Sequence, residues 1–310
     1  MKYKIYKFEF ITGVHFGKRA LEDAEYSLGA DTIFSAVCQE LVKKDSQMLP
    51  DFVEKTRVGK LVISDAFPYI GTTYYLPKPI WRIETENKQG DSTIKKAYKK
   101  LSYIPAEEFS VYLDGKLDVK RVVNHLKTEL GDKEIKTSAW VRNGEETLPY
   151  RVGVYSFKPQ SGLYIILGYQ EESDLEWIEE IFRGIGFAGI GGKKHAGLGR
   201  FQLQGEELKK SMQNRLESQT GSLYMLLSGS MPKEDELEAA LKGAAYLLSK
   251  RSGFVASSDY APEQMRKRDF YLMQAGSCFG CRFQGDIYQV GAGGAHPVYR
   301  YAKPLFMEVF

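Results

Sequence analysis

The chain has 310 residues, enough for about two ordinary domains, and its hydrophobic share of 43% is that of a globular protein. Its formal net charge of +3 permits a polyanionic partner without requiring one, because local clustering of cations matters more than the total. No apolar run reaches the roughly 18 residues of a membrane span, and the N-terminus alternates charged and apolar residues unlike a signal peptide, so we expect a cytoplasmic protein without membrane contact.

The N-terminal stretch predicts a strand, a helix and a second strand. Residues 3–10 alternate apolar and charged side chains and predict a strand that ends before Gly13. After a polar loop, residues 31–42 place apolar side chains in two rows four positions apart, which predicts a helix with Asp31 as its N-cap. Residues 61–67 predict the second strand.

The same order returns after a long insertion. Residues 163–167 and 200–203 predict strands, and residues 173–185 predict the helix between them, with Ser173 and Glu176 as a capping box. The order βαβ, insertion, βαβ is that of the ferredoxin-like (RRM-like) fold. We therefore predict an α+β protein whose first domain covers residues 1–210.

The insertion, at about residues 71–158, carries its own signals. Two prolines at Pro77 and Pro79 stiffen the chain, and residues 87–91 predict a turn tip between two arms. A run of lysines interleaved with tyrosines follows, which fits a finger laid on nucleic acid; a solvated charged face is an equal alternative, because acidic residues dilute the run. The candidate contact residues of this finger, called the thumb candidates below, are Lys78, Trp81, Arg82, Lys95, Lys96, Lys99 and Lys100.

Residues 182–201 form a basic, glycine-rich loop between the second helix and the last strand. Gly184, Gly186 and Gly189 match the dinucleotide pattern G-x-G-x-x-G, but that pattern needs a strand before it and a helix after it, so we reject a Rossmann fold. A glycine-rich backbone can lie flat against a ligand, and the neighbouring cations favour an anion. The alternative is a surface connection without function.

We select the residues of this loop and of the loop after the first strand as candidate RNA-binding residues. Backbone amides, cations and aromatic rings are the groups that hold single-stranded RNA. The candidates are His15, Phe16, Gly17, Lys18, Arg19, Phe187, Gly189, Gly191, Gly192, Lys193, Lys194, His195, Gly197 and Arg200.

A second ferredoxin-like domain is predicted at residues 219–310, after a polar boundary at 209–222. Residues 223–227 predict a strand and residues 235–250 a long helix. Further strands are expected at 254–256, 270–273 and 286–290, and a glycine-rich turn follows that carries His296, Arg300 and Lys303.

The cysteines give little support for a metal or redox site. Cys278 and Cys281 form one C-x-x-C, but a structural zinc site needs two more ligands, and Cys38 falls in an apolar helical stripe. We predict no metal and no cofactor, and keep a metal or redox role as a minor alternative.

Several stretches together resemble a known family, the RAMP proteins of CRISPR systems. GIGGKKHAGLGRF resembles their glycine-rich signature loop, and VHFG followed by ADTIFSAV resembles their first loop and helix. SDAFPYIG, YYLPKP and HPVYRYAKP are similar to the Cas five group, in particular to the fourth subunit of the type III-A (Csm) effector complex. His195 departs from the pattern, since a small polar residue is expected there.

The resemblance implies a non-catalytic RNA-binding subunit of an antiviral type III-A complex. It implies that the chain holds the repeat-derived 5′ tag of the guide RNA and docks both the large polymerase-like subunit and a neighbouring RAMP backbone subunit. It also implies a thumb, at about residues 76–103, that contacts the start of the guide–target duplex, so target RNA is met only indirectly.

Two rival hypotheses remain open. Sister RAMP proteins are metal-independent endoribonucleases that process the guide precursor, and His15 is the candidate general base, because a histidine beside cations can act on a 2′-hydroxyl. The second rival hypothesis is a scaffold that contacts only proteins. It would give the basic glycine-rich loop no ligand.

Overall fold

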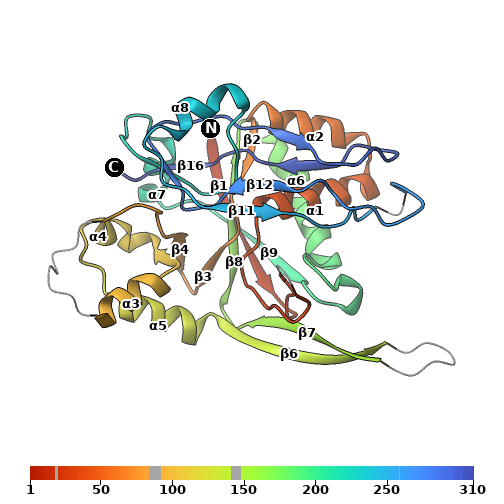
Figure 1. Ribbon diagram of the computed structural model, residues 1–310, viewed down its shortest axis with the longest axis horizontal. Helices are drawn as coiled ribbons and strands as arrows, with labels where there is room; N and C mark the ends of the chain where they lie inside the picture. Colours follow the sequence, from red (N-terminus) through yellow and green to blue (C-terminus); the bar gives the residue numbers. More distant parts are fainter. Residues whose placement is uncertain (18–19, 84–91, 141–147, 258) are drawn as a thin grey trace.

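The computed structural model describes residues 1–17, 20–83, 92–140, 148–257 and 259–310 (Figure 1). A central antiparallel sheet has the strand order β5-β4-β3-β8-β1-β9, with β2 also paired to β8. Its strands are β1 (Lys2–Phe10), β2 (Leu61–Ile63), β3 (Phe67–Ile70), β4 (Thr73–Pro77), β5 (Tyr103–Pro105), β8 (Ser161–Tyr169) and β9 (Phe201–Glu206). The longest of the fully buried strands is β8, every residue of which is buried, as the apolar run at 163–167 predicts.

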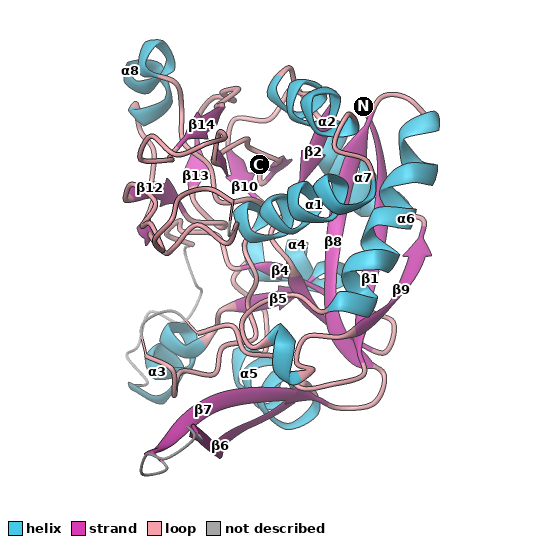
Figure 2. Cartoon of the chain, turned by 90° about the vertical axis from the view of Figure 1, so that its right-hand side faces the viewer, coloured by secondary structure: helices cyan, strands magenta, loops and turns pink. Residues whose placement is uncertain are grey.

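Helices α1 (Ala30–Lys44) and α6 (Ser173–Ala188) pack together against this sheet (Figure 2). Each buries an apolar stripe, for example Phe34 in α1 and Phe182 in α6, and α2 (Met48–Arg57) packs beside α1. The order β1, α1, β2 and β3, then β8, α6, β9 is the βαβ, insertion, βαβ order predicted from the sequence.

Three local details of that prediction are wrong. The strand expected at 61–67 is two strands, because Ser64 leaves the ladder and its hydroxyl accepts the Ile166 amide at 2.8 Å. Asp31 lies in the first turn of α1, after the N-cap Gly29, and its carboxylate is used by distant arginines instead. The N-cap of α6 is Glu172, and no capping-box bond from Ser173 forms.

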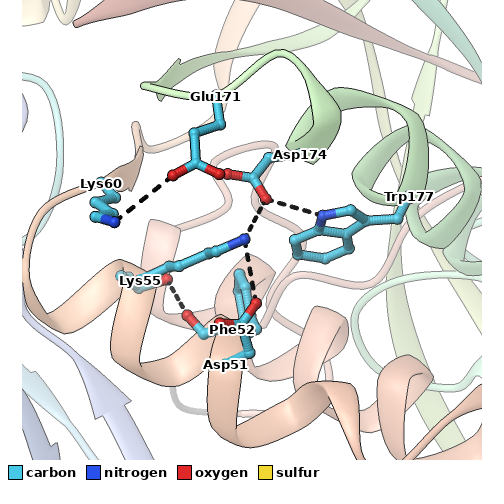
Figure 3. A network of polar contacts seen from close by, with 8 residues as sticks. Asp51, Phe52, Lys55, Lys60, Glu171, Asp174 and Trp177 are labelled. Atoms are coloured by element: carbon cyan, nitrogen blue, oxygen red, sulfur yellow. Dashed lines mark hydrogen bonds and ion pairs between the residues drawn. The ribbon is translucent and has the colours of Figure 1, made fainter.

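A polar network ties α2 to the start of α6 (Figure 3). Lys55 lies 2.7 Å from Asp174 and 3.2 Å from Asp51, and the Trp177 indole donates to Asp174 at 3.1 Å. Asp174 is only 1% exposed, so its charge needs this lysine. The contact explains why Asp174, in the first turn of α6, is buried, whereas Glu176 of the same turn is exposed.

The insertion divides between the sheet and a projection. Strands β4 and β5 extend the central sheet beyond β3, so part of the stretch predicted as a thumb belongs to the body of the fold. A two-stranded ribbon projects from the body at one end (Figure 1). The remaining elements are α3 (Ser92–Lys100), η1 (Ala106–Glu108), α4 (Phe109–Leu113), α5 (Val119–Glu129) and the ribbon strands β6 (Gly131–Trp140) and β7 (Leu148–Phe157). The turn tip predicted at 87–91 lies outside the described residues.

The C-terminal part, from residue 219, is built from small sheets. They have the orders β13-β10-β16, β11-β12 and β14-β15. Their strands are β10 (Tyr224–Leu226), β11 (Leu248–Arg251), β12 (Phe270–Met273), β13 (Cys278–Phe279), β14 (Ile287–Gln289), β15 (Tyr299–Tyr301) and β16 (Phe306–Glu308). The strands expected at 223–227, 270–273 and 286–290 are therefore found, whereas 254–256 forms a single bridge between Phe254 and Arg266.

The long helix predicted at 235–250 is wrong. Only η3 (Glu234–Glu236) and α8 (Leu237–Leu241) are helical, Gly243 turns the chain with φ of +68°, and Leu248 pairs with Met273 in a strand. Helical spacing of apolar residues was overridden by this pairing. Among the described residues after 219, no helix longer than α8 forms, so the expected second ferredoxin-like plan is not found there.

The C-terminal part shares one core with the first. The Tyr301 hydroxyl accepts the Ile63 amide at 2.8 Å and donates to the Ile63 carbonyl at 3.1 Å, and its ring packs 5.5 Å from Phe34. The segment between the two parts, predicted as a polar boundary at 209–222, holds α7 (Lys210–Glu217), which buries Leu216. The two parts are therefore fixed against each other by buried apolar contacts.

Candidate nucleic-acid cleft

The first loop and the glycine-rich loop, selected separately from the sequence, lie against each other. The Gly192 amide donates to the His15 carbonyl at 3.0 Å, and the Gly199 amide donates to the Gly13 carbonyl at 2.9 Å. The Arg200 amide donates to the Thr12 hydroxyl at 3.0 Å. Two segments that are far apart in the chain, with 188 positions between Thr12 and Arg200, therefore form one surface.

The glycines of this surface serve close packing more than freedom of movement. A Cβ on Gly191 would lie 2.6 Å from the Phe16 ring, and one on Gly199 would collide with the Ile190 carbonyl; both residues have positive φ, at +94° and +82°. Gly197, also with positive φ, faces open space. The expectation of a flexible loop with amides free for a ligand is therefore corrected, because most of these amides already bond to the protein.

Beside this surface lies a cleft of about 700 Å³. Its walls come from the two loops, from one face of α1, from the base of the insertion and from the C-terminal part. Four cations line it, namely Lys78, Lys194, Arg251 and Lys267. Two acids, Glu25 and Asp65, and the rings of Tyr26, Phe67 and Tyr103 line it as well.

The cations of the cleft are partly dehydrated. Burial lowers the pKa of Lys78, whose ammonium donates to the Tyr98 carbonyl at 2.8 Å. Partial burial, and then the positive charge of Lys43, lower the pKa of Lys194. A bound anion would relieve both effects, because it restores a partner to charges that have lost water.

A second group of predicted residues lies on the outer side of the glycine loop. Phe187 is 78% exposed and stacks against the Arg200 guanidinium at 5.3 Å from the ring centre. Lys193, with φ of +57°, places its ammonium 4.8 Å from the Tyr150 ring, which belongs to β7 near the end of the ribbon that is distant from the central sheet. Exposed rings and cations of this kind suit stacking and phosphate contact.

His15 and Phe16 have different environments. The His15 Nδ1 lies 2.7 Å from the Gly153 carbonyl, which can only accept, so Nδ1 carries a proton; in the neutral imidazole Nε2 is then the acceptor. Phe16 is 7% exposed and packs edge-on against Phe10 at 6.0 Å. Phe16 therefore shapes the cleft wall, and we correct the expectation that it offers a free ring.

Comparison with known proteins identifies the family. Residues 16–202 match the RAMP superfamily, and residues 219–309 match the CRISPR Csm4 C-terminal domain. The CRISPR system Cms protein Csm4 of Mycobacterium tuberculosis is 38% identical over 310 residues, covering 100% of this chain and 98% of that protein. The chain belongs to the Csm4 family. The Csm4 protein of Streptococcus thermophilus is 31% identical over 317 residues, covering 100% of this chain and 99% of that protein.

Solved structures show the same fold. A chain of the Csm3-Csm4 subcomplex of the type III-A interference complex has a TM-score of 0.68 at 18% identity, covering 99% of each chain. A chain of the Csm1-Csm4 cassette in complex with AMPPNP has a TM-score of 0.61 at 18% identity, covering 100% of this chain and 98% of that one. The RAMP resemblance drawn from the sequence is confirmed.

The thumb candidates of this Csm4-family chain fall into separate places. Lys78 lines the cleft, Trp81 and Arg82 are exposed beyond β4, and Lys96, Lys99 and Lys100 are exposed on α3. The side chain of Lys95, and both Lys18 and Arg19 of the first loop, lie outside the described residues. The described candidates do not converge on one point.

Sequence reasoning missed the cleft residues of the C-terminal part. Arg251 is the last residue of β11, and Lys267 lies just before β12. Both line the cleft, but neither belongs to the first loop or the glycine-rich loop. Tyr26 and Tyr103, 6.0 Å apart, were missed as well. No local signal marks these positions, because only the fold brings them to the cleft.

Two of the three cysteines, Cys38 and Cys278, are unsuited to metal binding. Cys278 is fully buried in β13, and burial raises its pKa to about 12; burial raises the pKa of Cys38 to about 12 as well. A metal ligand must be a thiolate, which this disfavours. Within the described ranges, no three metal-ligating side chains gather, and no helix there is long and apolar enough to cross a membrane.

Proposed function

We propose that this Csm4-family chain is a non-catalytic RNA-binding subunit of a type III-A effector complex. It holds the repeat-derived 5′ tag of the guide RNA and docks the large polymerase-like subunit and a neighbouring RAMP backbone subunit. Family membership supports the place in the complex, since relatives of the same fold are found in Csm3-Csm4 and Csm1-Csm4 assemblies.

The observation that carries the RNA-binding proposal is the meeting of the two loops at a cationic cleft. Lys194 lines the cleft, Arg200 packs on exposed Phe187, and Lys193 lies beside the Tyr150 ring. Single-stranded RNA is held by cations that follow the backbone and by rings that stack on bases, and this surface offers both. The closely packed glycines keep the surface rigid, which lowers the entropy lost on binding.

The thumb role, contact with the start of the guide–target duplex, is proposed for residues 76–103. Its support is exposure: Trp81 is 38% exposed, and Lys96, Lys99 and Lys100 of α3 are exposed as well. An exposed tryptophan near cations can press on a base pair.

The direct test replaces the two loop lysines. We expect Lys193→Ala with Lys194→Ala to weaken binding of a single-stranded RNA carrying the 5′ tag. The slope of log affinity against log salt should flatten by about 0.7 per lost contact, because each contact releases counterions from the strand. Fluorescence anisotropy across a salt series measures both quantities.

A matched control removes two exposed lysines elsewhere, Lys210→Ala with Lys242→Ala. It changes net charge equally and should leave the slope unaltered. If the loop variant and the control have the same RNA affinity and the same salt slope, the glycine loop is not the RNA-binding site. If the wild-type protein itself does not bind the tag RNA although the complex assembles, the protein-only scaffold is favoured.

The endoribonuclease hypothesis keeps one specific support. The Gly153 carbonyl holds His15 in the tautomer whose Nε2 can accept a proton, and His15 lines the cleft. Incubation of the purified protein with repeat RNA in EDTA separates the two functions. Under the proposed function the RNA stays intact, whereas specific cleavage that disappears in His15→Ala would establish the enzyme.

A further inference from the structure

The C-terminal part contributes two cations to the cleft that no motif predicted, Arg251 and Lys267. Both line the same cleft as the glycine loop, and Arg251 lies beside Asp31 at the start of α1. Among the described residues, Arg251 has one long ion pair and Lys267 has none, so neither charge is fully neutralised within the protein.

Arg251 is only partly engaged. Its Nη2 lies 3.4 Å from the Asp31 Oδ1, a long ion pair, and its buried Nε has no hydrogen-bond partner among the described residues. A guanidinium has five N–H donors in a fixed fork. Gly29 permits the approach, since a Cβ there would lie 2.5 Å from the Arg251 Nη2.

The charges around this arginine do not balance. Arg300 takes the other oxygen of Asp31 at 2.5 Å, and no ion pair joins Lys267 to another described residue. The cluster therefore contains three cations, Arg251, Lys267 and Arg300, and two acids, Asp31 and Asp65. Even when both acids are ionised, one positive charge is left over. Burial and the positive charge of Arg300 lower the pKa of Lys267. One more anion would complete the cluster.

The cluster and the glycine loop lie at opposite ends of one helix face. Arg251 and Asp31 mark the start of α1, while Lys194 lies near Glu40 and Lys43 towards its end. Polar side chains between them, Thr32, Ser35 and Gln39, line the cleft. From residue 29 to residue 40 a helix rises about 16 Å, which is longer than one nucleotide step.

We propose that Arg251 and Lys267 form a second phosphate site, at which the C-terminal part holds the same single strand whose other phosphate lies at the glycine loop. The proposal rests on the proposed function for the identity of the strand. The strand then runs along α1 and bridges the two parts of the protein. Arg251 binds the phosphodiester with the donors that Asp31 leaves free, and Lys267 supplies the second charge.

The test uses the full chain and a single-stranded RNA of about ten nucleotides, within the usual site size of such surfaces. We expect Arg251→Gln with Lys267→Gln to weaken binding about tenfold at low salt and to flatten the salt slope by about 1.4, which is two contacts. The Asp31 carboxylate keeps Arg300 in this variant, so the fold should persist, and the thermal midpoint checks it. Lys267→Gln alone, which breaks no ion pair, should flatten the slope by about 0.7.

The outcomes distinguish this site from the proposed function. If the loop variant Lys193→Ala with Lys194→Ala loses affinity while the Arg251 and Lys267 variants bind as the wild type does, the second site is refuted and the proposed function stands. If only the C-terminal variants lose RNA affinity, the second site is supported and RNA binding by the glycine loop is refuted. Unchanged RNA binding with lost binding of the large subunit would instead assign these cations to a protein contact, and overturn the proposal.

Discussion

Two glycine-rich, basic segments of this chain have similar composition, but their cations differ in exposure to solvent. In residues 189–200, Lys194, His195 and Arg200 stay exposed beside the cleft. In residues 291–304, Arg300 and Lys303 are buried. The difference shows that the use of a cation is decided by whether a buried acceptor lies opposite it in the fold.

The buried acceptors of the second segment come from far along the chain. Arg300 pairs with Asp31, and the Lys303 ammonium donates to the carbonyls of Arg57 at 2.9 Å and Gly285 at 3.2 Å. Burial lowers the pKa of Lys303. These cations therefore hold the C-terminal part to α1 and α2, whereas those of the glycine loop remain available to a ligand.

The largest effect is expected from breaking the buried pair. Arg300→Met should destabilise the protein by about 3–5 kcal/mol, because it leaves the buried Asp31 with only the long contact to Arg251. Urea unfolding at pH 7 measures the change. Lys242→Met, at an exposed cation, is the matched control and should change stability by less than about 0.5 kcal/mol. A loss below about 1 kcal/mol for Arg300→Met would show that the two segments do not differ as described.

The next largest effect is the difference in stability loss between two glycine substitutions in residues 189–200, which separates close packing from backbone strain. Gly199→Ala and Gly197→Ala share positive φ, so both carry a strain of about 1–2 kcal/mol, but only Gly199 meets a neighbouring carbonyl. We expect Gly199→Ala to cost about 2 kcal/mol more than Gly197→Ala. Chemical denaturation compares them, and equal losses would mean that the loop is not closely packed at Gly199.

The smallest effect concerns a third cation with a buried partner, Lys55 of α2 (Figure 3). Hydrogen bonding to Asp174, with Asp51 contributing less, raises the pKa of Lys55 above 10.5, the value expected when unfolded. Its stabilisation is therefore complete below the unfolded pKa and is lost as pH rises through the folded pKa.

Unfolding free energies at pH 7, 9 and 11 test this dependence. The wild type should lose stability above about pH 10.5 relative to Lys55→Met, which lacks the titrating group. At pH 7 and 9 the difference between the two proteins should stay constant. A difference that instead changes between pH 7 and 9 would contradict the assignment to Lys55.

The regular elements around the site were open to sequence reasoning. Alternation in β1, the apolar run of β8 and the helical stripes of α1 and α6 each lie within a few residues of sequence, and each was found. The same rule failed at 235–250, where spacing typical of a helix gave way to the pairing of β11 with β12. Local periodicity predicts an element only where no distant strand competes for its backbone.

The candidate site divides in the same way. Glycines and cations clustered in the first loop and the glycine loop are visible in the sequence, and their resemblance to RAMP proteins identified the family. Arg251 and Lys267 carry no such mark, and Phe16 turned out to be part of the wall. A binding residue that stands alone in the sequence becomes recognisable only when the fold gathers its neighbours.

By itself, the sequence determined the alternation of strands and helices, the two loops and the family, because periodicity and motif chemistry act over short stretches. Tertiary structure alone decided which cations are paired: Asp31 and Arg300 meet across 269 positions of the chain. The physical reason is that an ionised group is stable in the interior only beside an opposite charge, and that neighbour is chosen by folding and not by sequence proximity.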